Sequence, residues 1–127
     1  MCLTFQRSKI GQNMNYEYNW DGCLKFICEM NLDIFDADDG YINPNETCKS
    51  KSQIFLNQIK SKGFNIPVCI LYEPGGGLTF QFRNNFEISV LNDGVFEFFH
   101  FKEESELLFF EDLNELIDHI TIHSENF

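Results

Sequence analysis

The fold of this chain is decided between residues 67 and 101, which read PVCILYEPGGGLTFQFRNNFEISVLNDGVFEFFHF. Apolar and polar residues alternate over residues 78–82 and again over residues 86–90. A period of two is typical of a strand with one buried face. Residues 67–73 and 95–101 are also apolar and rich in strand-forming residue types, so we expect four strands in this stretch.

Short turns separate these strands. Residues 74–77 read PGGG, residues 84–85 read NN, and residues 92–94 read NDG, which is a strong hairpin signal. Connections this short join antiparallel neighbours, because a parallel pair needs a crossover of about a dozen residues or more. We therefore expect an antiparallel meander of four to five strands, the fifth over residues 106–110.

Two helices are expected before the meander. Between residues 21 and 30, four apolar residues recur at i, i+3, i+4 and i+7, namely Cys23, Phe26, Ile27 and Met30. This spacing favours a helix with Asp21 as its cap, although Leu24, Phe26 and Cys28 also alternate as a strand would. A second helix is expected over residues 46–62, ending at Gly63. Its apolar face would hold Cys48, Ser52, Phe55, Leu56 and Ile59.

A third helix is expected over residues 112–120. Its core stripe would consist of Leu113, Leu116, Ile117 and Ile120. Asp112 followed three residues later by Glu115 is typical of a capping box. The whole pattern predicts an α+β fold, with the meander packed against an N-terminal helical part, a central helix and a C-terminal acidic helix. We expect one domain over residues 16–123, an arm over residues 1–15 and a tail over residues 124–127.

The composition excludes several classes of protein. The chain has 127 residues, of which 43% are hydrophobic and 16% aromatic, so it is not a disordered acidic segment. Nine Lys and Arg against twenty Asp and Glu give a net charge of −11, which disfavours direct binding to nucleic acid. No apolar run approaches the roughly 20 residues of a membrane span. We see no signal peptide, and the five irregularly spaced cysteines are typical of a reduced, cytoplasmic protein.

Cofactor motifs are weak throughout. Cys23 and Cys28 do not have a usual zinc-ligand spacing. An EF-hand alignment with Gly40 at loop position 6 puts Phe35 and Ala37 where ligand oxygens are required. The glycines at 75–77 lack the lysine of a phosphate loop. We therefore expect no cofactor, no metal and no catalytic residues. A small enzyme or metal-dependent domain would instead need a deep pocket that holds His100 with a cysteine or with paired acids.

Two acidic clusters are the candidate partner-binding residues. The first lies near the C-terminus, where carboxylates at 111, 115 and 118 are expected on one side of the helix. The second lies in a loop between the first two helices. A solvated face is the simpler interpretation, and a patch that docks on a basic surface is the functional one. The candidate residues are Asp36, Asp38, Asp39, Glu103, Glu104, Glu106, Glu111, Glu115 and Asp118.

The strand at 95–101 is apolar on both faces. One face carries Phe96, Phe98 and His100, and the other carries Val95, Glu97, Phe99 and Phe101. If helices cover only one face of the sheet, phenylalanine side chains remain exposed on the other. These residues then either fill a second core or form an interface, with a partner or as a homodimer through the aromatic sheet.

Two short stretches, Asn19-Trp20-Asp21-Gly22 and Asp39-Gly40-Tyr41, resemble the NWDGYGA signature of a family of small, uncharacterised bacterial and mobile-element proteins. The later residues 73–78 and 92–95 are similar to the glycine-rich strand pair of that family. The resemblance covers about residues 19–101 and implies helices followed by antiparallel strands, with no catalytic residues. The overall profile also resembles phage-encoded inhibitors of bacterial defence, including anti-CRISPR proteins.

These observations lead to one expected function and one alternative. We expect a non-catalytic, acidic binding protein that inhibits a bacterial nucleic-acid-handling defence protein by covering its basic surface, with carboxylates in place of phosphates. The alternative is an antitoxin or immunity protein that neutralises a cognate toxin. In both cases the partner is a protein with a basic surface, no membrane is involved, and the location is the cytoplasm of a bacterial or phage-infected cell.

Overall fold

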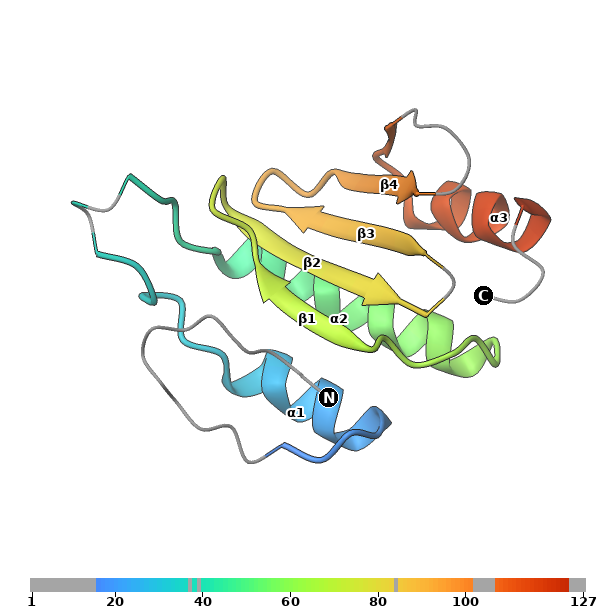
Figure 1. The fold of residues 1–127 in the computed structure, drawn as a ribbon, viewed down its shortest axis with the longest axis horizontal. Coiled ribbons are helices and arrows are strands. Elements are labelled where there is room, and N and C mark those ends of the chain that lie inside the picture. The colour runs from blue at the N-terminus through green and yellow to red at the C-terminus, as the bar shows by residue number, and fades with distance from the viewer. Residues whose placement is uncertain (1–15, 37, 39, 84, 102–106, 124–127) are drawn as a thin grey trace.

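A five-stranded antiparallel sheet forms the centre of the computed structural model, which describes residues 16–36, 38, 40–83, 85–101 and 107–123 (Figure 1). The strands follow one another in chain order, as the meander prediction required. They are β1 (Cys69–Tyr72), β2 (Gly77–Phe82), β3 (Phe86–Leu91), β4 (Phe96–His100) and β5 (Leu108–Phe110). The helices are α1 (Trp20–Glu29), α2 (Glu46–Ser61) and α3 (Leu113–His123). The α+β prediction is therefore confirmed, while the predicted arm at 1–15 and tail at 124–127 lie outside the described residues.

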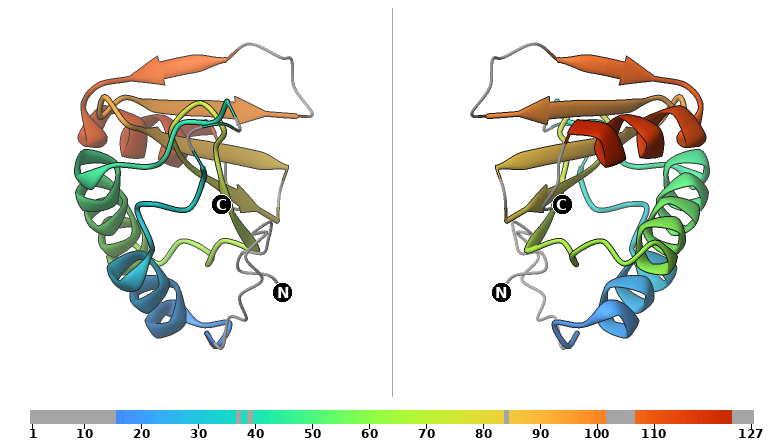
Figure 2. Two further views of the ribbon diagram at one scale, coloured as in Figure 1. Left: turned by 90° about the vertical axis from the view of Figure 1, so that its left-hand side faces the viewer. Right: turned by 90° about the vertical axis from the view of Figure 1, so that its right-hand side faces the viewer.

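All three helices pack on one face of the sheet (Figure 2). Phe55 of α2 lies against Phe80 and Phe96, with ring centroids 5.4 and 6.2 Å away. The α3 side chains of Leu116, Ile117 and Ile120 are buried beneath β4 and β5. Apolar area removed from water contributes roughly 25 cal/mol per Å² to stability, so this layer is the main source of folding energy.

Strand register places alternate residues on the helix-covered face. Leu78 pairs with Val90, and Phe80 pairs with Ile88. All four side chains are completely buried. The residues between them point to the opposite side of the sheet. The apolar and polar positions that alternate in the sequence therefore lie on different faces of the sheet.

The start of α1 differs from the prediction. Asn19, not Asp21, is the N-cap, because its side-chain oxygen accepts a 2.7 Å hydrogen bond from the Gly22 backbone N–H. Gly22 lies so close to the carbonyl oxygen of Glu17 that a Cβ there would be 1.9 Å from it. Asn19 and Gly22 of the NWDG stretch therefore have a structural role, fixing how the chain enters α1.

The start of α3 confirms Asp112 as the cap but leaves Glu111 outside the helix. The helix begins at Leu113, and a side-chain oxygen of Asp112 accepts a 3.1 Å hydrogen bond from the Asn114 N–H. Glu111 consequently lies in the turn before the helix, so its predicted place on a helical face is wrong. The helix also continues beyond the predicted end at residue 120, to His123.

Asn92 connects two turns and a helix at one end of the sheet. Its side-chain oxygen accepts from the Asn45 N–H at 2.9 Å, and its side-chain nitrogen donates to the Asn43 carbonyl at 2.8 Å. Its backbone N–H donates to the carbonyl of Gly76 in the preceding hairpin. Asn45 is in turn the N-cap of α2, so this end of the molecule is one hydrogen-bonded unit.

Within the described part of the chain, no helix has the length and apolar character needed to cross a membrane.

Candidate partner-binding surface

The sheet face opposite the helices is here called the open face. The strand register places one set of alternate residues on this face, and Val95, just before β4, lies on the same side. They are Cys69, Leu71, Thr79, Gln81, Glu87, Ser89, Leu91, Val95, Glu97, Phe99 and Phe109. Five of these residues are polar or charged, including two glutamates and no lysine or arginine, and Thr79 and Ser89 at the centre are buried. These strand residues therefore give the open face a mixed character with a negative charge.

The centre of the open face uses its polar groups internally. Thr79 and Ser89 are paired across β2 and β3, and their hydroxyl oxygens lie 2.8 Å apart in a hydrogen bond. Beside them, the Gln81 side-chain nitrogen donates to the Glu87 carboxylate at 2.8 Å. Polar groups that are satisfied in this way hold the strands in register.

The β4–β5 side of the open face is the most exposed apolar region of the sheet. Phe109 is 59% exposed, and Phe101, just beyond β4, is 54% exposed. The rings of Phe99 and Phe101 pack edge to face, with centroids 4.7 Å apart. Phe109 lies opposite Glu97 on the neighbouring strand. Exposed phenylalanines on the same side of neighbouring strands are candidates for an interaction surface.

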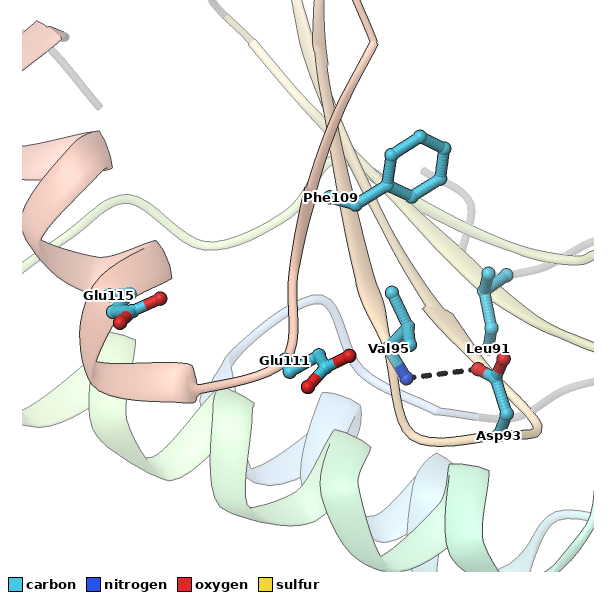
Figure 3. Close-up of a pocket in the computed structure, with 6 residues that line it drawn as sticks. All are labelled: Leu91, Asp93, Val95, Phe109, Glu111 and Glu115. Carbon is cyan, nitrogen blue, oxygen red and sulfur yellow. Dashed lines mark hydrogen bonds between the residues drawn. The ribbon is translucent and has the colours of Figure 1, made fainter.

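A depression of about 510 Å³ lies at the end of the open face, between the β3–β4 turn and the start of α3 (Figure 3). We call it the acidic depression. Leu91, Val95 and Phe109 supply apolar groups, and the remaining lining residues are Asp93, Glu111 and Glu115. Figure 3 shows Glu111 between Glu115 and Val95, so carboxylates and apolar side chains share one hollow.

Glu97 extends the negative charge from this end onto the open face. Partial burial is the main cause that raises the pKa of its carboxyl group above the usual value of 4.5. The neighbouring carboxylates of Glu73 and Asp93 raise that pKa further, because like charges disfavour ionisation. A cation that arrived beside Glu97 would therefore relieve an existing repulsion.

The predicted partner-binding residues are only partly brought together. Glu111 and Glu115 line the acidic depression. Asp118 is exposed on the next turn of α3 and does not line it. Asp36 and Asp38 are exposed on the connection between α1 and α2, and do not line it either. Four further candidates lie outside the described residues, namely Asp39, Glu103, Glu104 and Glu106.

Two acidic residues of this surface are not indicated by the sequence pattern. The NDG stretch predicts only a turn at Asp93, where its side chain does accept a 3.1 Å hydrogen bond from the Val95 N–H. The strand pattern puts Glu97 on an apolar face and gives it no role. The alternation of side chains along the strand could have identified Glu97, because it puts Glu97 on the same side as Val95 and Phe99.

Two of the cysteines and two of the histidines have structural surroundings. Cys23 and Cys48 are completely buried, and burial raises the pKa of their thiols to about 12 and about 11. A thiol that stays protonated at neutral pH is a poor nucleophile. His100 stacks on Phe86, with centroids 4.3 Å apart, and His119 packs edge-on against Phe98.

The described residues contain no group of three or more His, Cys, Asp or Glu side chains placed to hold a metal ion. Comparisons with protein-family models, with curated proteins and with solved structures found no match. What this surface binds is therefore inferred from its chemistry, and the resemblance to the NWDGYGA proteins stays a prediction.

Proposed function

We propose that this protein is a non-catalytic binding protein that covers the basic surface of a bacterial nucleic-acid-handling protein, in the manner of an anti-CRISPR inhibitor. The observation that carries the proposal is the acidic depression, where three carboxylates share one hollow with Leu91, Val95 and Phe109. The place of action is the cytoplasm of a bacterial or phage-infected cell.

The chemistry of the surface supports a basic protein partner. Carboxylates at an interface attract lysine and arginine side chains over long range and accelerate association. The neighbouring exposed phenylalanines supply apolar area, which stabilises a complex once it has formed. Surfaces that bind nucleic acid are rich in lysine and arginine, so they have the charge that fits this site.

The net charge of the whole chain, −11, acts in the same direction. A partner that normally binds phosphates meets a negative molecule of about the size of a small domain. While the carboxylates of the acidic depression bind the partner's basic side chains, those side chains cannot contact phosphate. Inhibition of this kind is competitive binding without a chemical reaction. A surface of carboxylates and phenylalanines is sufficient for it.

The first test is a pull-down from bacterial lysate at low and at high salt, with the captured protein identified by mass spectrometry. We expect a partner that binds at low salt and is released at high salt, because salt screens exposed charges. Its identity separates a defence inhibitor from an antitoxin: a nuclease or other nucleic-acid-handling protein supports the proposal, and a cognate toxin supports the alternative.

The second test locates the binding surface with matched charge reversals. One variant carries Glu111→Lys, Glu115→Lys and Asp118→Lys, and the control carries Asp33→Lys, Asp36→Lys and Asp38→Lys. Both change the net charge equally, and circular dichroism confirms folding. We expect the first variant to bind the captured partner more than about tenfold more weakly than the control, since close charge pairs contribute over 1 kcal/mol each. Equal affinities would contradict the proposed surface.

A further inference from the structure

We propose that the partner contacts this protein through an extended, basic segment that adds to β5 as a sixth strand. This inference rests on the proposed function, and it specifies the form of the partner's contact. The main observation is the direction of the backbone groups in β5.

The direction of each backbone group in β4 follows from two hydrogen bonds. The Leu91 N–H donates to the Val95 carbonyl at 3.0 Å, and the Phe101 N–H donates to the Asn85 carbonyl at 2.8 Å. Hydrogen-bonding direction alternates along an antiparallel strand. The odd-numbered residues of β4, Glu97 among them, therefore bond to β3.

The even-numbered residues of β4 consequently bond to β5. Phe96 is paired with Phe110, and Phe98 is paired with Leu108. Phe109 lies between these two bonded positions, so its own N–H and C=O point away from β4. The outer margin of β5 thus presents a donor and an acceptor in the geometry that a further strand requires.

Within the described residues, β5 is the last strand of the sheet and pairs with β4 alone. It forms the upper margin of the sheet in both views of Figure 2. Phe109 is 59% exposed, and Leu107, just before the strand, is 45% exposed. At the other side of the sheet, Phe26 of α1 packs on the helix-covered face of β1, with ring centroids 6.1 Å from Tyr72.

Charge specifies which strand would fit. Side chains of an added strand fall alternately on the two sides of the sheet. Those on the open face would lie beside Phe109 and near the carboxylates of Glu97 and Glu111, where lysine or arginine is favoured. Those on the other side would lie beside Leu108 and Phe110, where apolar residues are favoured. The segment is therefore expected to alternate basic and apolar residues.

A second copy of this chain fits the same margin less well. Two β5 strands side by side would bring together two sets of the same carboxylates, including Glu111 and Asp93. Like charges across an interface disfavour a wrong partner, whereas a basic segment gains from the same groups.

The test uses two synthetic eight-residue peptides, one alternating lysine and valine and the other alternating glutamate and valine. They are added to the full-length, ¹⁵N-labelled protein, and NMR follows the amide exchange rate of Phe109 and the chemical shifts of Glu111 and Glu115. At saturation, we expect the lysine peptide to slow exchange at Phe109 at least about tenfold, because its N–H becomes hydrogen-bonded. The glutamate peptide is expected to leave this rate unchanged.

Two variants separate the backbone from the side chain. Phe109→Pro removes the outward N–H, which β4 does not use, and proline is tolerated on edge strands. Phe109→Ala removes the ring but keeps the N–H. We expect the proline variant to bind the lysine peptide at least about tenfold more weakly than the alanine variant, because only proline abolishes a strand hydrogen bond.

Three results would overturn strand addition. The first is a lysine peptide that shifts Glu111 and Glu115 while Phe109 exchanges as fast as before. The second is equal affinity of the proline and alanine variants. The third is slow exchange at Phe109 without peptide, together with a doubled solution mass, which would make a second copy the occupant. None of these contradicts the proposed function, whose failure would appear instead as equal partner affinity of the two charge-reversal variants.

Discussion

Gly22 shows how much of the fold depends on a single missing side chain. The helix that contains it begins where the Glu17 carbonyl passes over the glycine, leaving no space for a Cβ. The same residue donates its N–H to the capping side chain of Asn19. A close backbone approach of this kind is a reason for glycine that does not depend on a special backbone angle.

We predict that Gly22→Ala destabilises the protein by about 2 kcal/mol, because forcing a methyl group into a filled space costs more than alanine gains in helix propensity. Urea denaturation monitored by circular dichroism measures this change. Gly75→Ala is the matched control, since a Cβ there meets nothing within 4 Å. A similar loss in both variants would mean that the Glu17 contact is not the cause.

Glu97 predicts a pH effect on stability. Its pKa in the folded protein is raised above the usual value of 4.5, so the folded state holds the proton more tightly than the unfolded state does. The contribution of Glu97 to stability is therefore most favourable below the unfolded-state pKa and is lost as the pH rises through the folded-state pKa.

Glu97→Gln removes this loss, so the variant is expected to be more stable than the wild type at pH 7. The difference should shrink at pH 4, and thermal denaturation at the two pH values checks it. Glu87→Gln removes one negative charge from the same face and controls for net charge. If both variants change stability equally at pH 7, the specific surroundings of Glu97 have no part in the effect.

At the scale of elements, Asn92 connects the β3–β4 turn to the start of α2. Substituting alanine removes the acceptor for the Asn45 N–H and the donor to the Asn43 carbonyl. We expect Asn92→Ala to lower the free energy of unfolding by about 1 to 3 kcal/mol, because it removes two hydrogen bonds that each contribute about 0.5 to 1.5 kcal/mol.

Chemical denaturation measures the effect of Asn92→Ala, and Asn57→Ala provides the comparison. Asn57 is exposed within α2 and donates only to the Gln53 carbonyl one turn earlier. Its replacement by alanine should be neutral or slightly stabilising, because alanine has the higher helix propensity. Equal destabilisation by the two substitutions would contradict the connecting role of Asn92.

The elements themselves were predictable because their periodicities are strong. The i, i+3, i+4, i+7 spacing from Cys23 to Met30 correctly favoured a helix over a strand. The cap was not predictable, since Asn19 and Asp21 are both good N-cap residues and the close approach of the Glu17 carbonyl to Gly22 is not visible in the periodicity. The position of Glu111 was not predictable from spacing either. Residues 111, 115 and 118 have the spacing of one helical face, but Asp112 caps the helix by accepting from the Asn114 N–H, so the helix begins after Glu111.

At the scale of the molecule, the sequence left open which face of the sheet the helices cover. β4 is apolar on both faces, so alternation cannot identify the buried one. The register decides it, by pairing Phe96 with the fully buried Val90 while Glu97 pairs with Ser89. The candidate site was therefore only half predictable: its charges were visible in the sequence, but the aromatic surface beside them depended on the packing.

The carboxylates of the open face predict that the protein resists self-association. Glu87→Leu combined with Glu97→Leu would join the exposed phenylalanines into a larger apolar patch, and patches of that kind promote association. We expect the wild type to remain a monomer and the double variant to form dimers or larger species, as measured by light scattering. The control, Asp33→Leu with Asp36→Leu, changes charge and hydropathy equally on a loop. Association of the control alone would contradict this prediction.

The shortness of β5 also limits the stoichiometry of the proposed complex. The strand has three residues, and Phe109 lies between the two that pair with Phe96 and Phe98. A single extended segment uses the outward N–H and C=O of Phe109 together. The complex formed at this margin should therefore contain one basic segment for each copy of this chain.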